Sequence, residues 1–171
     1  MSEPVSVAAV LAFGANLGER APTINEAVRE LASSPGILSV RMSSLVESVA
    51  VTPAGPAPDE PAYLNAVALV QTTLTPRELL HTALHIEQRF GRVRTQRWAA
   101  RTLDIDIVAY GDSRVSELDL VIPHPQAANR LFVLAPWLEL DPDASLAGAG
   151  RVADIAAALT ATQTRPAEVA R

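Results

Sequence analysis

The spacing of apolar positions along the chain predicts a series of strands and helices. Residues 5–14 form an apolar run, rich in Val and Ala, that ends in a glycine-containing turn, which is typical of a buried strand. A helix is expected from the capping box that begins at Thr23 up to the Pro35-Gly36 stop. Residues 37–51, rich in Val, Leu and Ser, predict a long second strand.

A proline-rich stretch separates this segment from the next strand. Residues 52–61 hold four prolines and are predicted to lack regular structure. Residues 63–73 are again strand-like, and we expect them to pair antiparallel with the strand before the prolines. A second capping box, with Pro76 at the first helical position, predicts a helix that ends at Gly91.

The remaining segments complete a predicted mixed fold. Residues 103–110 alternate apolar and acidic positions, which is the period of a half-buried strand. We further expect a short strand over 118–122 and helices over 125–138 and 152–159. This order indicates an α+β fold of ferredoxin-like type, with a mainly antiparallel sheet and helices packed on it. The length predicts that residues 1–171 form a single domain.

The composition excludes several chemistries. The absence of cysteine excludes disulfides, thiolate metal sites and cysteine nucleophiles. All 14 basic residues are arginine, so Walker-type phosphate loops and Schiff-base mechanisms, which need lysine, are excluded too. The net charge of −5 does not favour binding to nucleic acid. No apolar stretch approaches the roughly 20 residues that cross a bilayer, and we expect a cytoplasmic protein with no membrane partner.

Two aspartates in the predicted strand 103–110 are the strongest candidates for chemistry. Asp104 and Asp106 are two residues apart, so their side chains point to the same face, roughly 6.6 Å apart, while their apolar neighbours face the core. Two carboxylates at this separation suit one or two Mg²⁺ ions, whose other ligands are water and substrate phosphates. The spacing alone fits the solvated face of an edge strand equally well.

Five of the 14 arginines fall within the thirteen residues that end at position 101. They are Arg89, Arg92, Arg94, Arg97 and Arg101. Guanidinium groups bind phosphate oxygens in bidentate geometry, and an anion would relieve the repulsion within such a cluster. A solvated basic turn that pairs with acidic residues elsewhere is the alternative. Together with the aspartates, the cluster predicts a metal-bound polyphosphate and phosphoryl transfer that depends on positioning and charge.

Several aromatic and amide side chains could contact a planar ligand. Trp98 lies inside the arginine segment and is a candidate for packing over a base or closing a lid. Asn65 shares the strand face of Tyr63 and could offer both a donor and an acceptor to the edge of a heterocycle. Taken alone, Tyr63 and Phe132 are better explained as core residues.

The histidines fall in two places. His81 and His85 lie one turn apart on a predicted helix, where a solvated face explains them better than a metal site without a third ligand. His124 lies between Pro123 and Pro125, which present its imidazole rigidly.

At these positions the chain resembles the 6-hydroxymethyl-7,8-dihydropterin pyrophosphokinase family of folate biosynthesis, over residues 13 to about 141. The most specific motif is Arg-Trp-x-x-Arg-Thr-Leu-Asp-x-Asp at residues 97–106. The other matching segments are Phe13-Gly14-Ala15-Asn16-Leu17-Gly18, Thr52-Pro53, Pro61-Ala62-Tyr63-Leu64-Asn65-Ala66, Glu87, Gly91-Arg92-Val93-Arg94, Ile122-Pro123-His124-Pro125 and Asn129-Arg130-Leu131-Phe132.

The resemblance implies transfer of pyrophosphate from ATP, the co-substrate, to the pterin hydroxymethyl group, with release of AMP. It implies that Asp104 and Asp106 hold two Mg²⁺ ions and that Arg92 and Arg101 close over the triphosphate as catalytic residues. The residues it assigns to ATP are Glu87, Arg94, Trp98, Arg101, Ile107, His124 and Arg130. The residues it assigns to the pterin are Thr52, Pro53, Ala54, Tyr63, Asn65, Trp98 and Phe132. Tyr63 and Phe132 are expected to sandwich the ring, and the protein is expected to act as a monomer.

Two other functions fit part of the pattern. A regulatory module could bind nucleotide or pterin without chemistry, and it would then release no AMP. A binder of single-stranded RNA could use the arginine segment and Trp98, and its affinity would fall steeply with salt. Identification of the nucleotide product separates both from the leading hypothesis.

Overall fold

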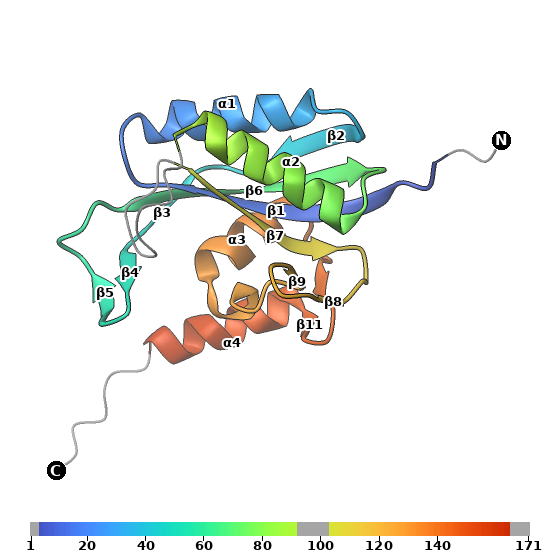
Figure 1. Cartoon of the computed structure of the whole chain (residues 1–171). Helices are drawn as coiled ribbons and strands as arrows, with labels where there is room; N and C mark the ends of the chain where they lie inside the picture. Colours follow the sequence, from blue (N-terminus) through green and yellow to red (C-terminus); the bar gives the residue numbers. More distant parts are fainter. Residues whose placement is uncertain (1–3, 92–102, 165–171) are drawn as a thin grey trace, which may run out of the picture.

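The computed structural model describes residues 4–91 and 103–164. Its centre is an antiparallel sheet (Figure 1). In spatial order, its strands are β2 (Ile37–Met42), β6 (Tyr63–Thr72), β1 (Val7–Ala15) and β7 (Asp104–Tyr110), and β3 (Val46–Ser48) also pairs with β6. The helix α1 (Arg20–Ala32) follows β1, and α2 (Pro76–Arg89) precedes β7. This is the ferredoxin-like α+β arrangement that the order of elements predicted.

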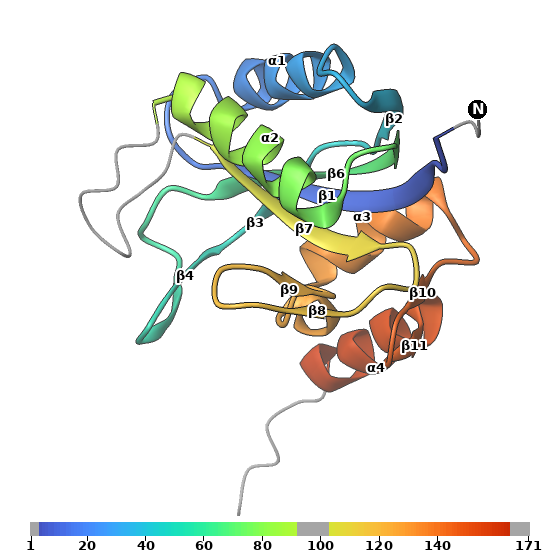
Figure 2. The ribbon, with the colours of Figure 1, turned by 45° about the vertical axis from the view of Figure 1, so that its right-hand side comes forward.

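The helices α1 and α2 cover one face of the sheet, as Figures 1 and 2 show. Their apolar side chains, including Ile24 and Ile86, pack with Leu11 and Phe13 of β1 in one buried cluster. The capping box of α2 is present as predicted, with Thr75 as the N-cap. The exposed positions of this helix include both His81 and His85, which confirms their expected solvated face.

A second helical layer covers the opposite face of the sheet. The helices α3 (Leu131–Leu140) and α4 (Val152–Thr164) lie below the sheet in Figure 1. Here Val67 and Val108 of the sheet pack with Leu134 and Trp137 of α3 in a separate buried cluster. This layer is added to the ferredoxin-like core, and the order of elements did not indicate on which face it lies.

The structure corrects two of the predicted elements. The helix α1 begins one turn before Thr23, because the Thr23 backbone N–H already donates to the Glu19 carbonyl, and the predicted Thr23 cap is not used. The predicted long strand over 37–51 is broken into β2, β3 and β4 (Ala50–Thr52). The break coincides with Ser43, whose buried side chain accepts from the Val67 N–H.

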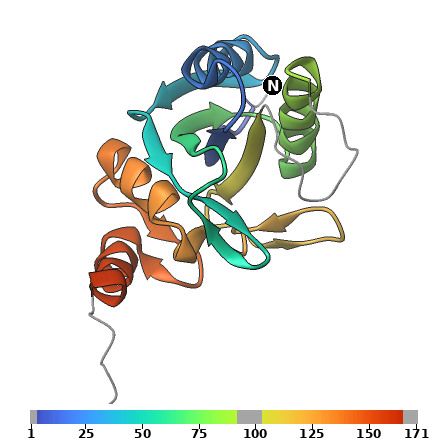
Figure 3. The ribbon, with the colours of Figure 1, turned by 90° about the vertical axis from the view of Figure 1, so that its left-hand side faces the viewer.

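The proline-rich stretch is not wholly irregular, which corrects the prediction for residues 52–61. The strands β4 and β5 (Gly55–Ala57) form a short hairpin. Proline is tolerated at position 56 because each strand of a two-stranded sheet has an unpaired side, where no backbone N–H donor is needed. Figure 3 views the molecule from the end of the sheet where β1 ends and β6 begins, with this hairpin in the foreground.

The segments after β7 form smaller elements. The strands β8 (Val115–Ser116) and β9 (Val121–Ile122) make a hairpin, and β10 (Ser145–Leu146) and β11 (Gly150–Arg151) make another. The helix predicted over 125–138 is divided into the 3₁₀ turn η1 (Ala127–Asn129) and α3. Within residues 4–91 and 103–164, no helix combines the length and the apolar character that crossing a membrane requires.

Candidate functional site

Asp104 and Asp106 project from β7 as the alternation predicted. Both aspartates are partly exposed, whereas Ile105 and Ile107 are buried in the cluster beneath α1 and α2. The aspartates therefore lie on the other face of the sheet, the one that α3 and α4 cover farther along. Because Ile107 is buried, a ligand could reach this residue only through its backbone.

A glycine separates this acidic strand from the predicted pterin residues. Gly14 of β1 pairs with Asp104 on one side and with Asn65 of β6 on the other. Directly paired residues of antiparallel strands share a face, so the three positions form one row across the sheet. A Cβ placed on Gly14 would lie 3.4 Å from Oδ1 of Asn65 and 3.6 Å from Cδ1 of Tyr63. Because glycine has no side chain, the middle of this row is bare backbone, which we call the Gly14 floor; it lies between an amide and a carboxylate and beside the Tyr63 ring.

The Asn65 side chain has a fixed orientation. Its Nδ2 donates to the carbonyl oxygen of Val46 at 3.1 Å and to Oγ of Ser48 at 2.8 Å. Since a carbonyl can only accept, the amide nitrogen must face Val46, and Oδ1 is left on the side of Gly14. The expectation that Asn65 offers a donor as well as an acceptor is therefore corrected, because both N–H groups are used by β3.

His124 and Arg130 converge on Asp106. The His124 Nε2 and the Arg130 Nη1 each lie 3.7 Å from Oδ2 of Asp106. Burial lowers the pKa of His124 below its ordinary value of 6.5, the Asp106 carboxylate opposes this effect, and Arg130 adds to it. A neutral imidazole is therefore favoured at pH 7. The three residues place a carboxylate, a guanidinium and an imidazole around one point.

Arg130 also contacts the predicted aromatic residue of α3. Its guanidinium carbon lies 5.8 Å from the centre of the Phe132 ring, within the range of a cation–π contact. Phe132 is partly buried against the second core, and Tyr63 on β6 is also partly buried. Each ring therefore keeps some surface for a ligand while it is held by neighbouring elements.

Glu87 on α2 is buried, with 2% of its surface exposed. Its Oε1 accepts a 2.7 Å hydrogen bond from the Ile105 backbone N–H, between the two aspartates. Since β7 is the edge of the main sheet, this carboxylate takes the place of a neighbouring strand. The observed role of Glu87 is to hold β7, and direct contact with ATP stays a prediction.

The predicted pterin contacts Thr52, Pro53 and Ala54 lie in the β4–β5 hairpin. The Thr52 hydroxyl donates to the Gly55 carbonyl within the hairpin, and Pro53 and Ala54 are exposed at its tip. By contrast Ser48, which the sequence did not single out, pairs with Tyr63 and holds Asn65 directly. Ser48 lies two residues after Val46, which is the ladder partner of Asn65. This proximity to Asn65 becomes apparent only once the strand pairing is known.

Several predicted residues lie outside the described ranges. These are Arg92, Arg94, Trp98 and Arg101. The arginine that precedes them, Arg89, is described: its Nη1 lies 2.6 Å from Oε1 of Glu30 on α1. This member of the arginine cluster thus pairs with an acidic residue, as the alternative interpretation of the cluster held.

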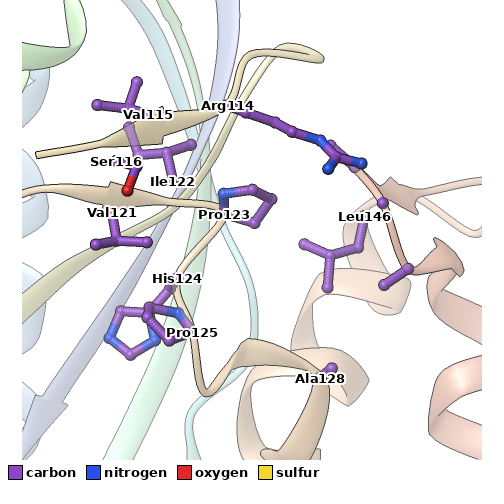
Figure 4. Close-up of a pocket in the computed structure, with 13 residues that line it drawn as sticks. Arg114, Val115, Ser116, Val121, Ile122, Pro123, His124, Pro125, Ala128 and Leu146 are labelled. Atoms are coloured by element: carbon purple, nitrogen blue, oxygen red, sulfur yellow. The ribbon is translucent and has the colours of Figure 1, made fainter.

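A cavity of about 440 Å³ adjoins the site at His124 (Figure 4). The β8–β9 hairpin, the segment that follows it and the turn between β10 and β11 form its walls. Of the predicted site residues that the structure describes, His124 alone lines it. The cavity is therefore distinct from the Gly14 floor.

Comparison with known proteins decides the family. Residues 10–142 match the model of the 7,8-dihydro-6-hydroxymethylpterin-pyrophosphokinase family. The chain belongs to this family. The resemblance that the sequence motifs indicated is thereby confirmed.

Individual pyrophosphokinases show how much of the chain is shared. A Synechocystis protein named 2-amino-4-hydroxy-6-hydroxymethyldihydropteridine pyrophosphokinase is 44% identical over 135 residues, which cover 79% of this chain and 67% of that protein. A protein of the same name from Methylorubrum extorquens is 41% identical over 140 residues, covering 82% of this chain and 86% of that protein. Residues 10–142, which match the family, contain every predicted site residue that the structure describes.

Solved structures of pyrophosphokinase fusions share the fold. The Plasmodium falciparum HPPK-DHPS crystal structure with pteroate superposes with a TM-score of 0.72 at 14% identity, covering 95% of this chain and 44% of that chain. This chain thus spans less than half of the fusion protein. The similarity supports the ferredoxin-like fold of this chain.

Proposed function

We propose that this chain catalyses the reaction of its family, the transfer of pyrophosphate from ATP to 6-hydroxymethyl-7,8-dihydropterin in folate biosynthesis. The hydroxymethyl oxygen forms a bond to the β-phosphorus of ATP and loses its proton, while the bond between that phosphorus and the oxygen bridging to the α-phosphorus breaks. AMP is the leaving group. The observation that carries the proposal is the single row Asn65–Gly14–Asp104. On one face of the sheet it brings together an amide oxygen that can accept a hydrogen bond from a heterocycle and a carboxylate that can hold Mg²⁺.

The pterin half of the site would lie over Gly14. The Asn65 Oδ1 would accept a hydrogen bond from the amino and N3–H edge of the pterin, since Nδ2 is held by β3. The Tyr63 ring, at the margin of the same floor, and Phe132 would contact the faces of the ring. With the ring over Gly14, its hydroxymethyl group would be directed to the acidic strand.

The ATP half would lie beside β7. The Arg130 guanidinium and the His124 imidazole would contact phosphate oxygens, and Arg92, Arg94, Trp98 and Arg101 are proposed to enclose the nucleotide from the preceding segment. The lowered pKa of His124 favours its neutral form, which can donate one hydrogen bond without adding a full charge. The local charge around Asp106 is therefore set chiefly by arginine.

Two Mg²⁺ ions would be held by Asp104 and Asp106. Among residues 4–91 and 103–164, no group of three or more Asp, Glu or His side chains is arranged to hold a metal. Two carboxylates would leave the remaining coordination positions of each Mg²⁺ to water and phosphate oxygens, as this ion prefers. When bound, Mg²⁺ would neutralise phosphate charge and make the β-phosphorus a better electrophile. The chain itself contributes the acidic oxygens and their fixed spacing.

The nucleotide product tests the proposal. Purified chain with ATP, Mg²⁺ and the hydroxymethyldihydropterin should release AMP and the pterin diphosphate in equal amounts. D104N and D106N should each lower turnover by at least about a hundredfold, since each removes charge that positions the reacting phosphates. The matched control is D143N, because Asp143 is an exposed carboxylate remote from β7 in the sequence, with 94% of its side chain accessible. Formation of ADP, or unchanged turnover in D104N, would refute the proposal.

A further inference from the structure

Arg20, the first residue of α1, connects that helix with the two strands that carry the predicted pterin contacts. Its Nη1 donates a 2.8 Å hydrogen bond to the carbonyl oxygen of Ala62. Its Nη2 donates to Oε1 of Glu47 at 2.9 Å. Ala62 directly precedes Tyr63 at the start of β6, and Glu47 is the middle residue of β3. One guanidinium therefore reaches both strands at the same end of the site.

The Arg20–Glu47 ion pair is one of several contacts that hold β3, together with its ladder to β6 and its packing against α3. This strand has three residues, and within the described ranges its ladder partner is β6 alone. Glu47 stands between Val46 and Ser48, which supply both acceptors of the Asn65 amide. A displacement of β3 from β6 would shift both acceptors together. The Asn65 Oδ1, which faces Gly14, would then lose its fixed direction.

A guanidinium suits this position better than an ammonium group does. It presents separate N–H groups in a rigid plane, so it can bond a carbonyl and a carboxylate at once, whereas an ammonium is a single point charge. The two hydrogen bonds of Arg20 contribute unequally to the stability of this contact. The Glu47 side chain is 64% exposed, so its ion pair contributes little, while the bond to Ala62 is partly buried and charge-assisted. The Ala62 contact should therefore account for most of the effect.

We propose that Arg20 is a positioning residue for the pterin half of the site. It acts through Ala62 and Glu47 to set the start of β6 and the direction of the Asn65 Oδ1, and it does not touch the substrate. This inference rests on the proposed function. It assigns a role in pterin recognition to a residue at the start of a helix on the opposite side of the sheet from α3.

The test compares the two substrates in the same variants. R20Q should raise the KM for the dihydropterin by up to about tenfold, the upper size expected when the Asn65 Oδ1 loses its hydrogen bond to the ring, while the KM for ATP changes less than about twofold. R20K, which can satisfy one acceptor at a time, should give about a threefold rise, and E47Q should stay within about twofold. The dihydropterin affinity measured by calorimetry should weaken in the same order.

A matched control separates positioning from general stability. Arg41 also donates from its guanidinium to a distant carbonyl, that of Leu140 at 2.7 Å, but it joins β2 to the end of α3. R41Q should leave both KM values unchanged. Equal increases of both KM values in R20Q, or a lower melting temperature with an unchanged dihydropterin KM, would overturn the inference. If R20Q does not fold, R20K decides by the same criteria. If the wild-type chain forms no AMP, the proposed function fails, and the calorimetric affinities still decide the role of Arg20.

Discussion

Replacement of Gly14 by alanine separates the stability of the sheet from recognition of the pterin. The new Cβ would lie 3.4 Å from Oδ1 of Asn65 and 3.6 Å from Cδ1 of Tyr63, which are distances of ordinary van der Waals contact. The backbone of Gly14 does not need the left-handed conformation, since its φ is not positive. Alanine in a strand is favoured over glycine by roughly 0.5–1 kcal/mol, so the folded state should be unchanged or slightly more stable.

The same methyl group should weaken pterin binding. The methyl group extends about 1.5 Å from the Cα of residue 14, the length of one carbon–carbon bond, and would displace a ring that lies over this position. A ring lifted by this amount leaves the range of about 2.7–3.2 Å in which Oδ1 of Asn65 can accept its hydrogen bond. Loss of that bond costs roughly 0.5–1.5 kcal/mol, and imperfect contact with Tyr63 adds to it. We expect a total of about 1.4 kcal/mol, or about tenfold in affinity.

Three measurements on G14A check this reasoning. Calorimetry gives the dihydropterin affinity, thermal unfolding gives the stability, and the AMP-release assay gives the KM for ATP as an internal control, since ATP should lie beside β7. An affinity for dihydropterin within about twofold of the wild-type value, in a variant with an unchanged melting temperature, would refute the idea that the ring lies over Gly14.

Four further variants, at three positions, test other parts of the structure. S48A removes one of the two acceptors of the Asn65 amide and should weaken dihydropterin binding about threefold to tenfold by calorimetry, with little change in ATP affinity. E87Q keeps an oxygen acceptor for the Ile105 N–H and should retain most stability, whereas E87A should lose roughly 1–3 kcal/mol in urea unfolding. The pKa of Glu78 is lowered by its hydrogen bonds with Thr75 in the capping box. The contribution of Glu78 to the free energy of unfolding is therefore complete above its ordinary pKa of 4.5 and is lost as the pH falls through the lower pKa of the folded state. Thermal unfolding across this acidic range should show a smaller loss of stability in E78Q than in the wild type.

The strands of the central sheet could be predicted because their pattern is local. The alternation around Asp104 and Asp106 gives the period of a strand and also assigns the two faces, and the structure confirms both. The capping box at Thr75 was predicted for the same reason, since all of its bonds lie within four residues. Where one turn of chain contains the whole interaction, sequence is sufficient.

Competition between neighbouring signals explains why the predicted start of α1 was wrong. The Thr23 motif has the residues of a capping box, but Pro22 fits within the first turn of a helix, where its missing N–H has no partner to lose. The helix can therefore start earlier, at Arg20. That earlier start also gives Arg20 its position near Ala62, which is 42 residues away in the sequence and could not be inferred from local pattern.

The chemistry that Asn65 offers depends on which of its atoms the fold already uses. An asparagine in a sequence has two donors and an acceptor, so the residue type leaves its role in recognition open. Pairing of β3 with β6 brings Val46 and Ser48 to the amide nitrogen, and this consumes both donors. In the structure Asn65 therefore offers Oδ1 as an acceptor, while its N–H groups are bonded to β3. A heterocycle that presents an acceptor atom at this edge would face the Asn65 Oδ1 with no proton between the two atoms. Such a heterocycle should therefore bind more weakly than the dihydropterin.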